Sequence, residues 1–127
     1  MPSFSRKSLD RLNTTDERLI RLFTEVVKHF DCTILEGIRS KSRQEQLVAQ
    51  GKSKTMNSKH LTGKAVDVAP YPIDWNDRER FTYFAGFVMG MAAKMSINLR
   101  WGGDWDKDNQ VKDNSFDDLP HFEIVGE

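Results

Sequence analysis

The chain of 127 residues holds little from which disulfides, membrane spans or an export signal could be built. Its single cysteine, Cys32, excludes an internal disulfide and a cysteine-based metal site, and we expect it to be buried as a small apolar side chain. No apolar run approaches the ~20 residues of a transmembrane helix. The stretch MPSFSRKSLDRLN lacks the apolar segment of a signal peptide, so we expect a protein that stays in the cytoplasm unless something else releases it.

An excess of charge of either sign is also missing. Lysine plus arginine and aspartate plus glutamate number 19 each, so no net field favours nucleic acid or an anionic membrane, and we expect neither as a partner. The sequence contains no repeats, low-complexity tracts or linkers. Since 38% of its residues are hydrophobic, it can form one sizeable core, and we expect a single domain over residues 1–127.

The spacing of apolar side chains predicts the order of helices and strands. The expected helices cover 14–30, 42–50 and 76–95, and the expected strands cover 32–37, 65–69, 97–101 and 121–125. Thr14 and Glu17 have the spacing of a capping box at the start of the first helix. Gly51 is the expected C-cap of the second helix, and Asn76 is the expected N-cap of the third.

The third helix is apolar on most of its circumference, which predicts a central, buried position. Gly86 and Gly90 share one of its faces, so we expect another element to approach the helix closely there. The order α-β-α-β-α-β-β is too irregular for a doubly wound sheet. It predicts an α+β domain in which helices pack on one side of a small, mostly antiparallel sheet.

The segment SKHLTGKAVDVAP places a carboxylate, Asp67, inside an apolar strand. A buried carboxylate needs a backbone donor, an arginine or a metal ion as partner. Two of the three histidines, His60 and His121, stand at the starts of strands, and the turn after His60 brings it back over the strand of Asp67. If the two strands are neighbours, two imidazoles and one carboxylate can converge as in a catalytic zinc site. On spacing alone, a chance arrangement stays open.

The segments SKHLTGKAVDVAP, GIRS, RWGGDW and DDLPHFE together resemble those of zinc peptidases that cleave bonds to D-amino acids in peptidoglycan. That family includes D-alanyl-D-alanine carboxypeptidases, vancomycin-resistance dipeptidases and phage L-alanyl-D-glutamate endolysins. SKHLTGKAVDVAP matches the pattern Ser-x-His-x-x-Gly-x-Ala-x-Asp, GIRS resembles Gly-aromatic-Arg-Ser, and DDLPHFE contains acid-x-x-His. Ile38 departs from the usual aromatic residue. The phage endolysins are the most similar branch, because they share the short chain, an IDWND-like helix start and the missing signal peptide.

The resemblance implies a hedgehog-like zinc peptidase fold with one zinc ion held by His60, Asp67 and His121. It implies hydrolysis of the L-alanyl-D-glutamate bond of the peptidoglycan stem peptide during host lysis. The enzyme would be a monomer that reaches the periplasm and cell wall after a holin opens the membrane. A D-alanyl-D-alanine carboxypeptidase and a wall-binding or structural zinc module remain the alternatives.

The resemblance also assigns roles around the metal. Asp118 is the expected general acid and base, whereas Asp117 would point the other way in an extended chain. Arg39 is expected to face the developing oxyanion or a substrate carboxylate, and a structural ion pair with a loop acid is the alternative. Ser58 is expected to bind substrate or to orient a zinc ligand, and Gln44 to line the cleft.

The segment RWGGDWDKDN allows two further interpretations. Trp101 and Trp105 are either a wall of the substrate groove, with the glycines letting an extended peptide pass close to the backbone, or core and rim aromatics. Asp104, Asp106 and Asp108 alternate as at the start of a calcium loop. Because Asn109 and Ser115 replace the glycine and glutamate of an EF-hand, a solvated acidic loop is the alternative to a calcium site.

Overall fold

The computed structural model of the protein describes residues 2–53, 56, 58–107, 109 and 118–126. Its elements in chain order are α1 (Arg6–Leu12), α2 (Glu17–Val26), β1 (Cys32–Glu36), α3 (Lys41–Ala49), the 3-10 helix η1 (Lys59–Thr62), β2 (Ala65–Pro70), α4 (Arg78–Lys94), β3 (Leu99–Trp101) and β4 (His121–Ile124). The strands form one sheet in the order β1-β2-β4-β3, and every neighbouring pair is antiparallel. The predicted fold class, a small antiparallel sheet with helices, is confirmed.

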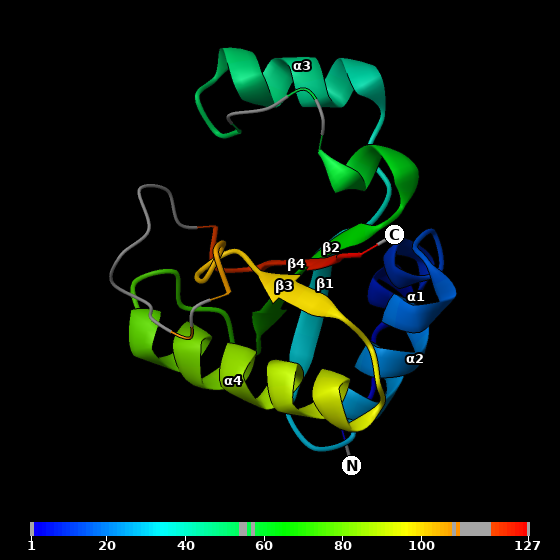
Figure 1. The fold of residues 1–127 in the computed structure, drawn as a ribbon, viewed down its shortest axis with the longest axis vertical. Helices are drawn as coiled ribbons and strands as arrows, with labels where there is room; N and C mark the ends of the chain where they lie inside the picture. Colours follow the sequence, from blue (N-terminus) through cyan, green and yellow to red (C-terminus); the bar gives the residue numbers. More distant parts are fainter. Residues whose placement is uncertain (1, 54–55, 57, 108, 110–117, 127) are drawn as a thin grey trace.

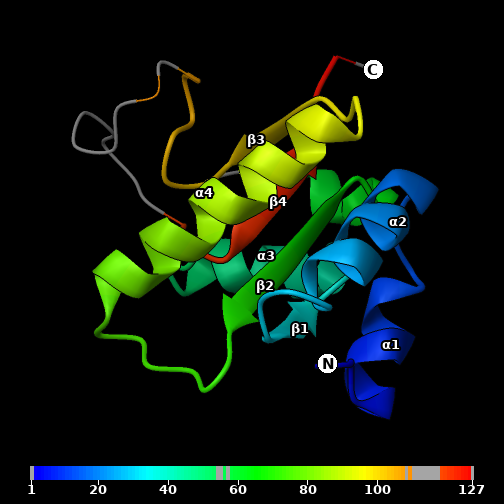
Figure 2. The same ribbon diagram turned by 90° about the horizontal axis from the view of Figure 1, so that it is seen from below.

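Helices cover the sheet unequally. Figures 1 and 2 show α2 and α4 on one face, with α1 beside β1, whereas α3 stands apart beyond the opposite face. The sequence of α3, KSRQEQLVA, buries only Gln44 and Leu47, so this helix has no apolar stripe with which to join the core. Packing on one side therefore holds for α1, α2 and α4, and α3 is left free to border a cleft.

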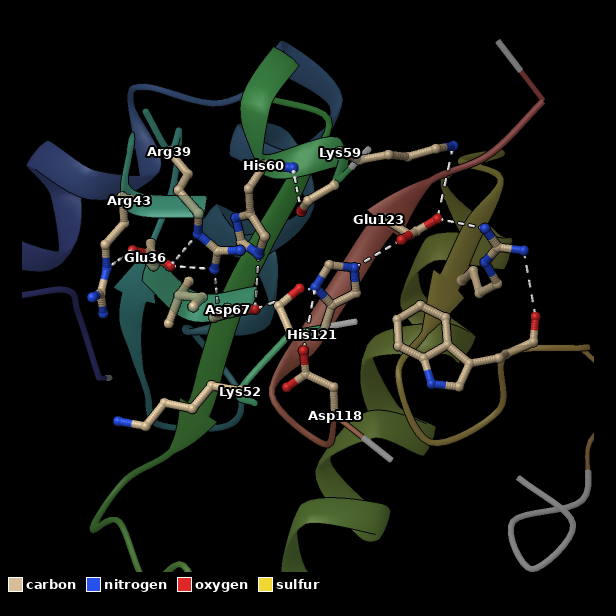
Figure 3. A pocket seen from close by; sticks show the side chains of 15 residues that line it. Glu36, Arg39, Arg43, Lys52, Lys59, His60, Asp67, Asp118, His121 and Glu123 are labelled. Carbon is tan, nitrogen blue, oxygen red and sulfur yellow. Dashed lines mark hydrogen bonds and ion pairs between the residues drawn. The ribbon is translucent and has the colours of Figure 1, made fainter. Parts of the chain in front are cut away.

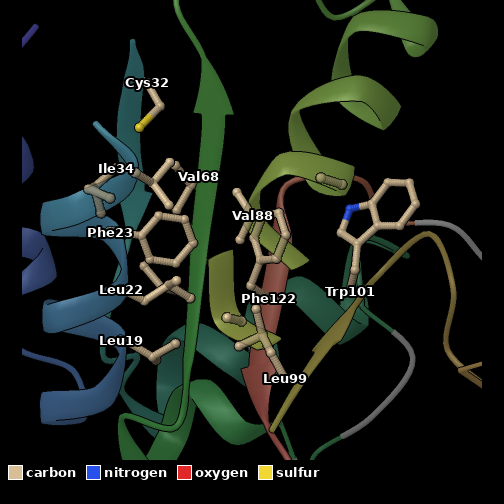
Figure 4. Packing of buried hydrophobic residues seen from close by; sticks show 14 of the residues in the cluster. Leu19, Leu22, Phe23, Cys32, Ile34, Val68, Val88, Leu99, Trp101 and Phe122 are labelled. Atoms are coloured by element: carbon tan, nitrogen blue, oxygen red, sulfur yellow. The ribbon is translucent and has the colours of Figure 1, made fainter. Parts of the chain in front are cut away.

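The hydrophobic core lies between the sheet and the pair α2 and α4 (Figure 4). Val68 of β2 and Phe122 of β4 face Phe23 of α2, whose ring lies 5.5 Å from that of Phe122 in an edge-on contact. Complete burial of one such side chain contributes about 1.5–3 kcal/mol. Cys32 is buried beside them as predicted, and desolvation raises the pKa of its thiol to about 12.

Strand β2 divides its side chains between two environments. Val66 and Val68 belong to the core, whereas Asp67 lies on the other face with the small side chains of Ala65 and Ala69, as strand alternation predicts. The carboxylate therefore points away from α2 and α4, toward the side on which α3 stands.

The first predicted helix begins later than expected. Its N-cap is Asp16, whose carboxylate accepts a hydrogen bond from the backbone N–H of Arg18. The hydroxyl of Thr14 instead donates to the carbonyl of Arg11 and accepts from the N–H of Ile38 at 2.9 Å. Thr14 thus links the end of α1, a helix that the sequence analysis did not predict, to the loop after β1.

Helix α4 covers one face of the sheet and is not enclosed. Its N-cap is Asp77, one residue after the predicted Asn76. Only the residues of one stripe are buried: Phe81, Phe84, Ala85, Val88 and Ala92. Gly86 and Gly90 lie on the exposed side, where no atom stands within 4 Å of an added Cβ, so the predicted close approach at these glycines is wrong.

The C-cap of α3 is Gln50, one residue before the predicted Gly51, and Gly51 follows it with a φ of 73°, the left-handed conformation that favours glycine after a helix end. In the described part of the chain, no helix has the length and apolar character that crossing a bilayer requires.

Candidate active site

The candidate site is assembled from two neighbouring strands and the turn before one of them. Strands β2 and β4 pair so that Asp67 lies directly opposite His121. The hydroxyl of Ser58 accepts from the N–H of His60 and caps η1, and Gly63 ends η1 in the left-handed conformation with a φ of 74°. This tight turn returns His60 over β2, as the sequence analysis predicted, and all three side chains meet (Figure 3).

Three potential metal ligands converge at this point. Nε2 of His60 lies 3.1 Å and Nδ1 of His121 lies 3.4 Å from the same carboxylate oxygen of Asp67. One ligand atom from each residue lies within 4.8 Å of the others, and the described ranges contain no other group of three or more histidine, cysteine or acidic side chains so arranged. The geometry brings together the three residues that were predicted as ligands.

The remaining ring nitrogens of both histidines have acceptors of their own. Nδ1 of His60 lies 2.8 Å from the carbonyl oxygen of Gly37, and Nε2 of His121 lies 2.8 Å from Oε1 of Glu123. Protons on these two nitrogens would leave the lone pairs of the other two available to a metal ion held beside Asp67. A set of two imidazoles and one carboxylate, with outer partners of this kind, fits zinc.

The local electrostatics follow from burial and from these contacts. Burial alone would raise the pKa of Asp67, but hydrogen bonds from His121 and His60 outweigh it and hold that pKa well below its usual range. Burial would lower the pKa of His121, yet the hydrogen bonds to Asp67 and Glu123 raise it to about 9. In the absence of a metal, His121 is therefore hydrogen-bonded to both Asp67 and Glu123.

Asp118 stands beside the three candidate ligands. Its Oδ2 lies 3.8 Å from Nδ1 of His121, and desolvation, followed by the charge of Asp67, raises its pKa to about 6. A carboxyl with such a pKa can exchange a proton near neutral pH. Its neighbour Asp117 lies outside the described residues.

The position of Asp118 depends on Gly102. The N–H of Asp118 donates to the carbonyl of Gly102 at 2.9 Å, and the N–H of Gly102 donates to the carbonyl of His121 at 2.8 Å. A Cβ on Gly102 would overlap the carbonyl group of Asp118. The close approach predicted for this glycine is therefore made by the protein's own chain, and the expectation that a substrate peptide uses it is corrected.

Arg39 joins the site to the loop after β1. Its guanidinium is paired with Glu36, donates to Oε1 of Gln44 at 2.7 Å and lies 3.5 Å from Oδ2 of Asp67. The structural ion pair considered as an alternative is thus present, and the same side chain also borders the candidate ligands. Gln44 is fully buried and donates to Ser53, so it supports Arg39 from behind and does not line the cleft as expected.

The two tryptophans occupy different environments. Trp101 is 5% exposed, belongs to the core and donates its indole N–H to the carbonyl of Leu119 at 2.6 Å. Its predicted contact with substrate is corrected, because β3 turns this ring inward. Trp105 lines the cleft instead, and its ring centroid lies 5.2 Å from that of His121.

The acidic segment after Trp105 is described only in part. A carboxylate oxygen of Asp104 accepts from the N–H of Asn109 at 3.0 Å. Asp108 and Ser115 lie outside the described residues, so the calcium site stays a prediction.

A cleft of about 460 Å³ surrounds the cluster. Besides the residues above, it is lined by charged side chains that the sequence analysis did not single out: Arg43, Lys52, Lys59, Arg100 and Glu123. Glu123 could have been found, because two positions along a strand place it on the same face as His121. The others carry no local signal that ties them to the metal.

Comparison with known proteins identifies the family of the chain. A family model described as phage L-alanyl-D-glutamate peptidase matches residues 2–125. The chain belongs to this family. It is 33% identical to the L-alanyl-D-glutamate peptidase of Escherichia phage T5, over 96% of this chain and 97% of that protein. The resemblance stated from the sequence motifs is confirmed, and the chain is a peptidase by family.

Solved structures extend the comparison to the fold. The L-Ala D-Glu endopeptidase ChiX of Serratia marcescens superposes with a TM-score of 0.79 and 28% identity, covering 98% of this chain and 91% of that one. The vancomycin-resistance D,D-pentapeptidase VanY, solved in complex with Zn(II), gives a TM-score of 0.56 at 17% identity, covering 88% of this chain and 73% of that one. The chain therefore has the sequence of this peptidase family and the fold of the wider group of zinc peptidases.

Proposed function

We propose that this chain is a zinc peptidase that hydrolyses the bond between L-alanine and D-glutamate in the stem peptide of peptidoglycan. The observation that carries the proposal is the convergence of His60, Asp67 and His121 beside Asp118 in a member of this peptidase family. The names of the phage T5 relative and of ChiX supply the bond. We infer that one zinc ion per chain is held by the three converging residues.

A bound zinc ion supplies Lewis acidity, which polarises a carbonyl and makes a water molecule more acidic. Asp118 accepts the proton of the attacking water and delivers it to the nitrogen of the leaving amine. Its raised pKa suits both steps, because a carboxyl that titrates near pH 6 is neither a very weak base nor a very weak acid at neutral pH. Its 36% side-chain exposure leaves it open to a substrate in the cleft.

Arg39 is proposed to stabilise the negative charge that develops on the carbonyl oxygen of the scissile bond. Glu36 and Gln44 fix its guanidinium, and preorganised donors of this kind need no reorientation during the reaction. Ser58 orients His60 through the cap of η1, which supports the second of its two predicted roles. Trp105 offers an apolar wall, and Arg43 and Lys52 offer positive charge to the carboxylates of a stem peptide.

The biological setting is part of the same proposal. We infer that the enzyme acts as a monomeric endolysin, made in the host cytoplasm and admitted to the periplasm and wall when a holin opens the membrane. The similarity of the chain to the L-alanyl-D-glutamate peptidase of Escherichia phage T5 supports this setting.

Digestion of purified peptidoglycan sacculi tests the proposed function. We expect new amino termini on D-glutamate, no new reducing sugar ends, loss of activity with a chelator and recovery with zinc. Release of free D-alanine alone would assign the carboxypeptidase activity instead. If the wild type binds zinc but, like Asp118→Asn, releases no product from sacculi, the protein is a structural or wall-binding zinc module.

A further inference from the structure

Among the described residues, Glu123 is the most deeply buried carboxylate that lies near the candidate metal ligands without being one of them. It is 5% exposed, and its Oε1 lies 2.8 Å from Nε2 of His121, two positions earlier on β4. A lone buried carboxylate is costly, so its partners explain why it is tolerated. Arg100 donates to Oε2 at 2.6 Å, and the ammonium of Lys59 lies 3.8 Å from the same oxygen.

The two histidines are held differently. His60 uses a neutral acceptor, the carbonyl of Gly37, whereas His121 uses the charged carboxylate of Glu123. An imidazole that donates to a carboxylate is a stronger electron donor at its other nitrogen than one that donates to a carbonyl. The ring of His121 therefore depends on Glu123 for both its orientation and its basicity.

The contacts of Glu123 reach three elements. Arg100 belongs to β3 and extends from Glu123 to Trp105, whose carbonyl its Nη1 contacts at 3.4 Å. Trp105 in turn lies against the ring of His121. Lys59 precedes His60 in η1 and also donates to the carbonyl of Ile124. Figure 3 shows Glu123 between Lys59 and His121, on the side of the ring away from Asp67.

We propose that Glu123 is a positioning residue for the metal site. It keeps the proton of His121 on Nε2, turns Nδ1 toward Asp67 and increases the affinity of the imidazole for a cation. Arg100 and Lys59 hold the carboxylate in place. The inference rests on the proposed metal site and is independent of which peptide bond the enzyme cleaves.

The test measures zinc affinity on metal-free protein, by competition with a chromophoric chelator. Glu123→Gln keeps the size of the side chain and an acceptor oxygen but removes the charge. We expect zinc to bind about 10–100-fold more weakly, as for other outer partners of metal-bound histidines. In long-range ¹⁵N–¹H spectra of the zinc-loaded wild type, we expect the ring proton of His121 on Nε2.

Glu36→Gln is the matched control. Glu36 lines the same cleft, and its substitution removes the same negative charge. Its ion pairs are with Arg39 and Arg43 and not with a histidine. We expect its effect on zinc affinity to stay within about threefold, small against the range for an outer partner of a ligand. Equal weakening in both variants would show that only the total charge of the cleft matters, and would overturn the proposal.

Two further outcomes are decisive. Unchanged zinc affinity in Glu123→Gln, with or without a lower melting temperature, would make Glu123 a purely structural residue. A spectrum with the proton of His121 on Nδ1 in the loaded wild type would also overturn the inference. A wild-type protein that binds no zinc would contradict the proposed function itself. Failure of the proposed function can thus be distinguished from failure of the role proposed for Glu123.

Discussion

Asp67 and His121 face each other across the antiparallel pair β2 and β4, with Nδ1 of the histidine 3.4 Å from Oδ1 of the aspartate. Strand register alone fixes this pairing, because a slip by one residue would send each side chain to the opposite face of the sheet. The core residues that flank them, Val66 and Phe122, point the other way and are fully buried. Packing of the core on one face therefore guarantees the geometry of the site on the other.

Replacement of Asp118 by asparagine tests the general acid and base. Asp118→Asn preserves size, so zinc content and melting temperature should stay near those of the wild type. Hydrolysis of sacculi should slow by roughly 10²–10⁴-fold. Asp117→Asn should be far milder. An active Asp118→Asn together with an inactive Asp117→Asn would transfer the role to Asp117.

The same carboxyl should shape the pH profile of the enzyme. Desolvation and the charge of Asp67 raise the pKa of Asp118 to about 6, and a bound cation would lower it again. Asp118 cannot accept a proton once it is protonated, so the rate should fall as the pH drops through a value at or below about 6. Asp118→Asn should lack this acid limb. An identical limb in both proteins would assign it to another group.

Zinc binding should itself depend on pH. The hydrogen bonds of His121 to Asp67 and Glu123 outweigh desolvation and raise its pKa to about 9 in the metal-free protein. Zinc must displace this proton, so apparent affinity should rise about tenfold per pH unit below pH 9 and level off above it. Competition titrations at several pH values measure the slope. An affinity that does not change between about pH 6 and pH 8 would contradict a protonated His121.

A methyl group at Gly102 should separate activity from metal binding. In Gly102→Ala the added Cβ overlaps the carbonyl group of Asp118, so that residue must move, while His60 and Asp67 are untouched. We expect strongly reduced hydrolysis with zinc still bound. Gly86→Ala is the control, because nothing lies within 4 Å of a Cβ added on this exposed side of α4. This variant should gain about 0.5–1 kcal/mol of stability and keep full activity. Full activity in Gly102→Ala would show that the contact does not position Asp118.

Asp16 should stabilise the fold in a pH-dependent way. The side-chain hydrogen bond of Arg18 and the ammonium of Lys64 hold its pKa well below its usual range, against desolvation. The stabilisation is therefore complete above the ordinary pKa of an aspartate, about 3.9, and is lost as the pH falls toward the lower folded value. Asp16→Ala also removes the N-cap of α2 and should cost about 0.5–2 kcal/mol in urea unfolding at neutral pH.

The difference between Asp16→Ala and the wild type should shrink at low pH. Asp10→Ala is the control, because its ion pair with Arg6 is exposed and contributes little. A loss of stability in Asp16→Ala that is equally large at acid pH would mean that helix capping, and not charge, is responsible.

Local sequence patterns predicted many of the residues in the candidate site. Alternation along β2 placed Asp67 opposite the core, and the resemblance of the motifs around His60 and His121 to a known peptidase family predicted the cluster. The chemistry of a strand face is a short-range property, so a single sequence reports it well. The mostly antiparallel sheet followed from the irregular order of helices and strands.

Long-range contacts account for what the sequence did not predict. Helix α1 has few apolar residues, and its place beside β1 depends on Ser8 and Arg11 reaching Ile34. The side chain of Trp101 points into the core and that of Trp105 points into the cleft, and no local sequence pattern distinguishes the two. The apolar outer face of α4 contains small residues that need no cover, so its composition suggested more burial than its packing provides.

The pairing of β2 with β4 ties metal binding to the folding of the last strand. His121 comes from a segment far along the chain from His60 and Asp67, so the three proposed ligands lie together only while β4 is paired with β2. Local opening of β4 would release the ion, and a bound ion must in turn suppress that opening by the free energy of its binding. Amide hydrogen exchange in β4 should accordingly slow in proportion to zinc concentration. The stability of this strand against local opening is then set by the metal.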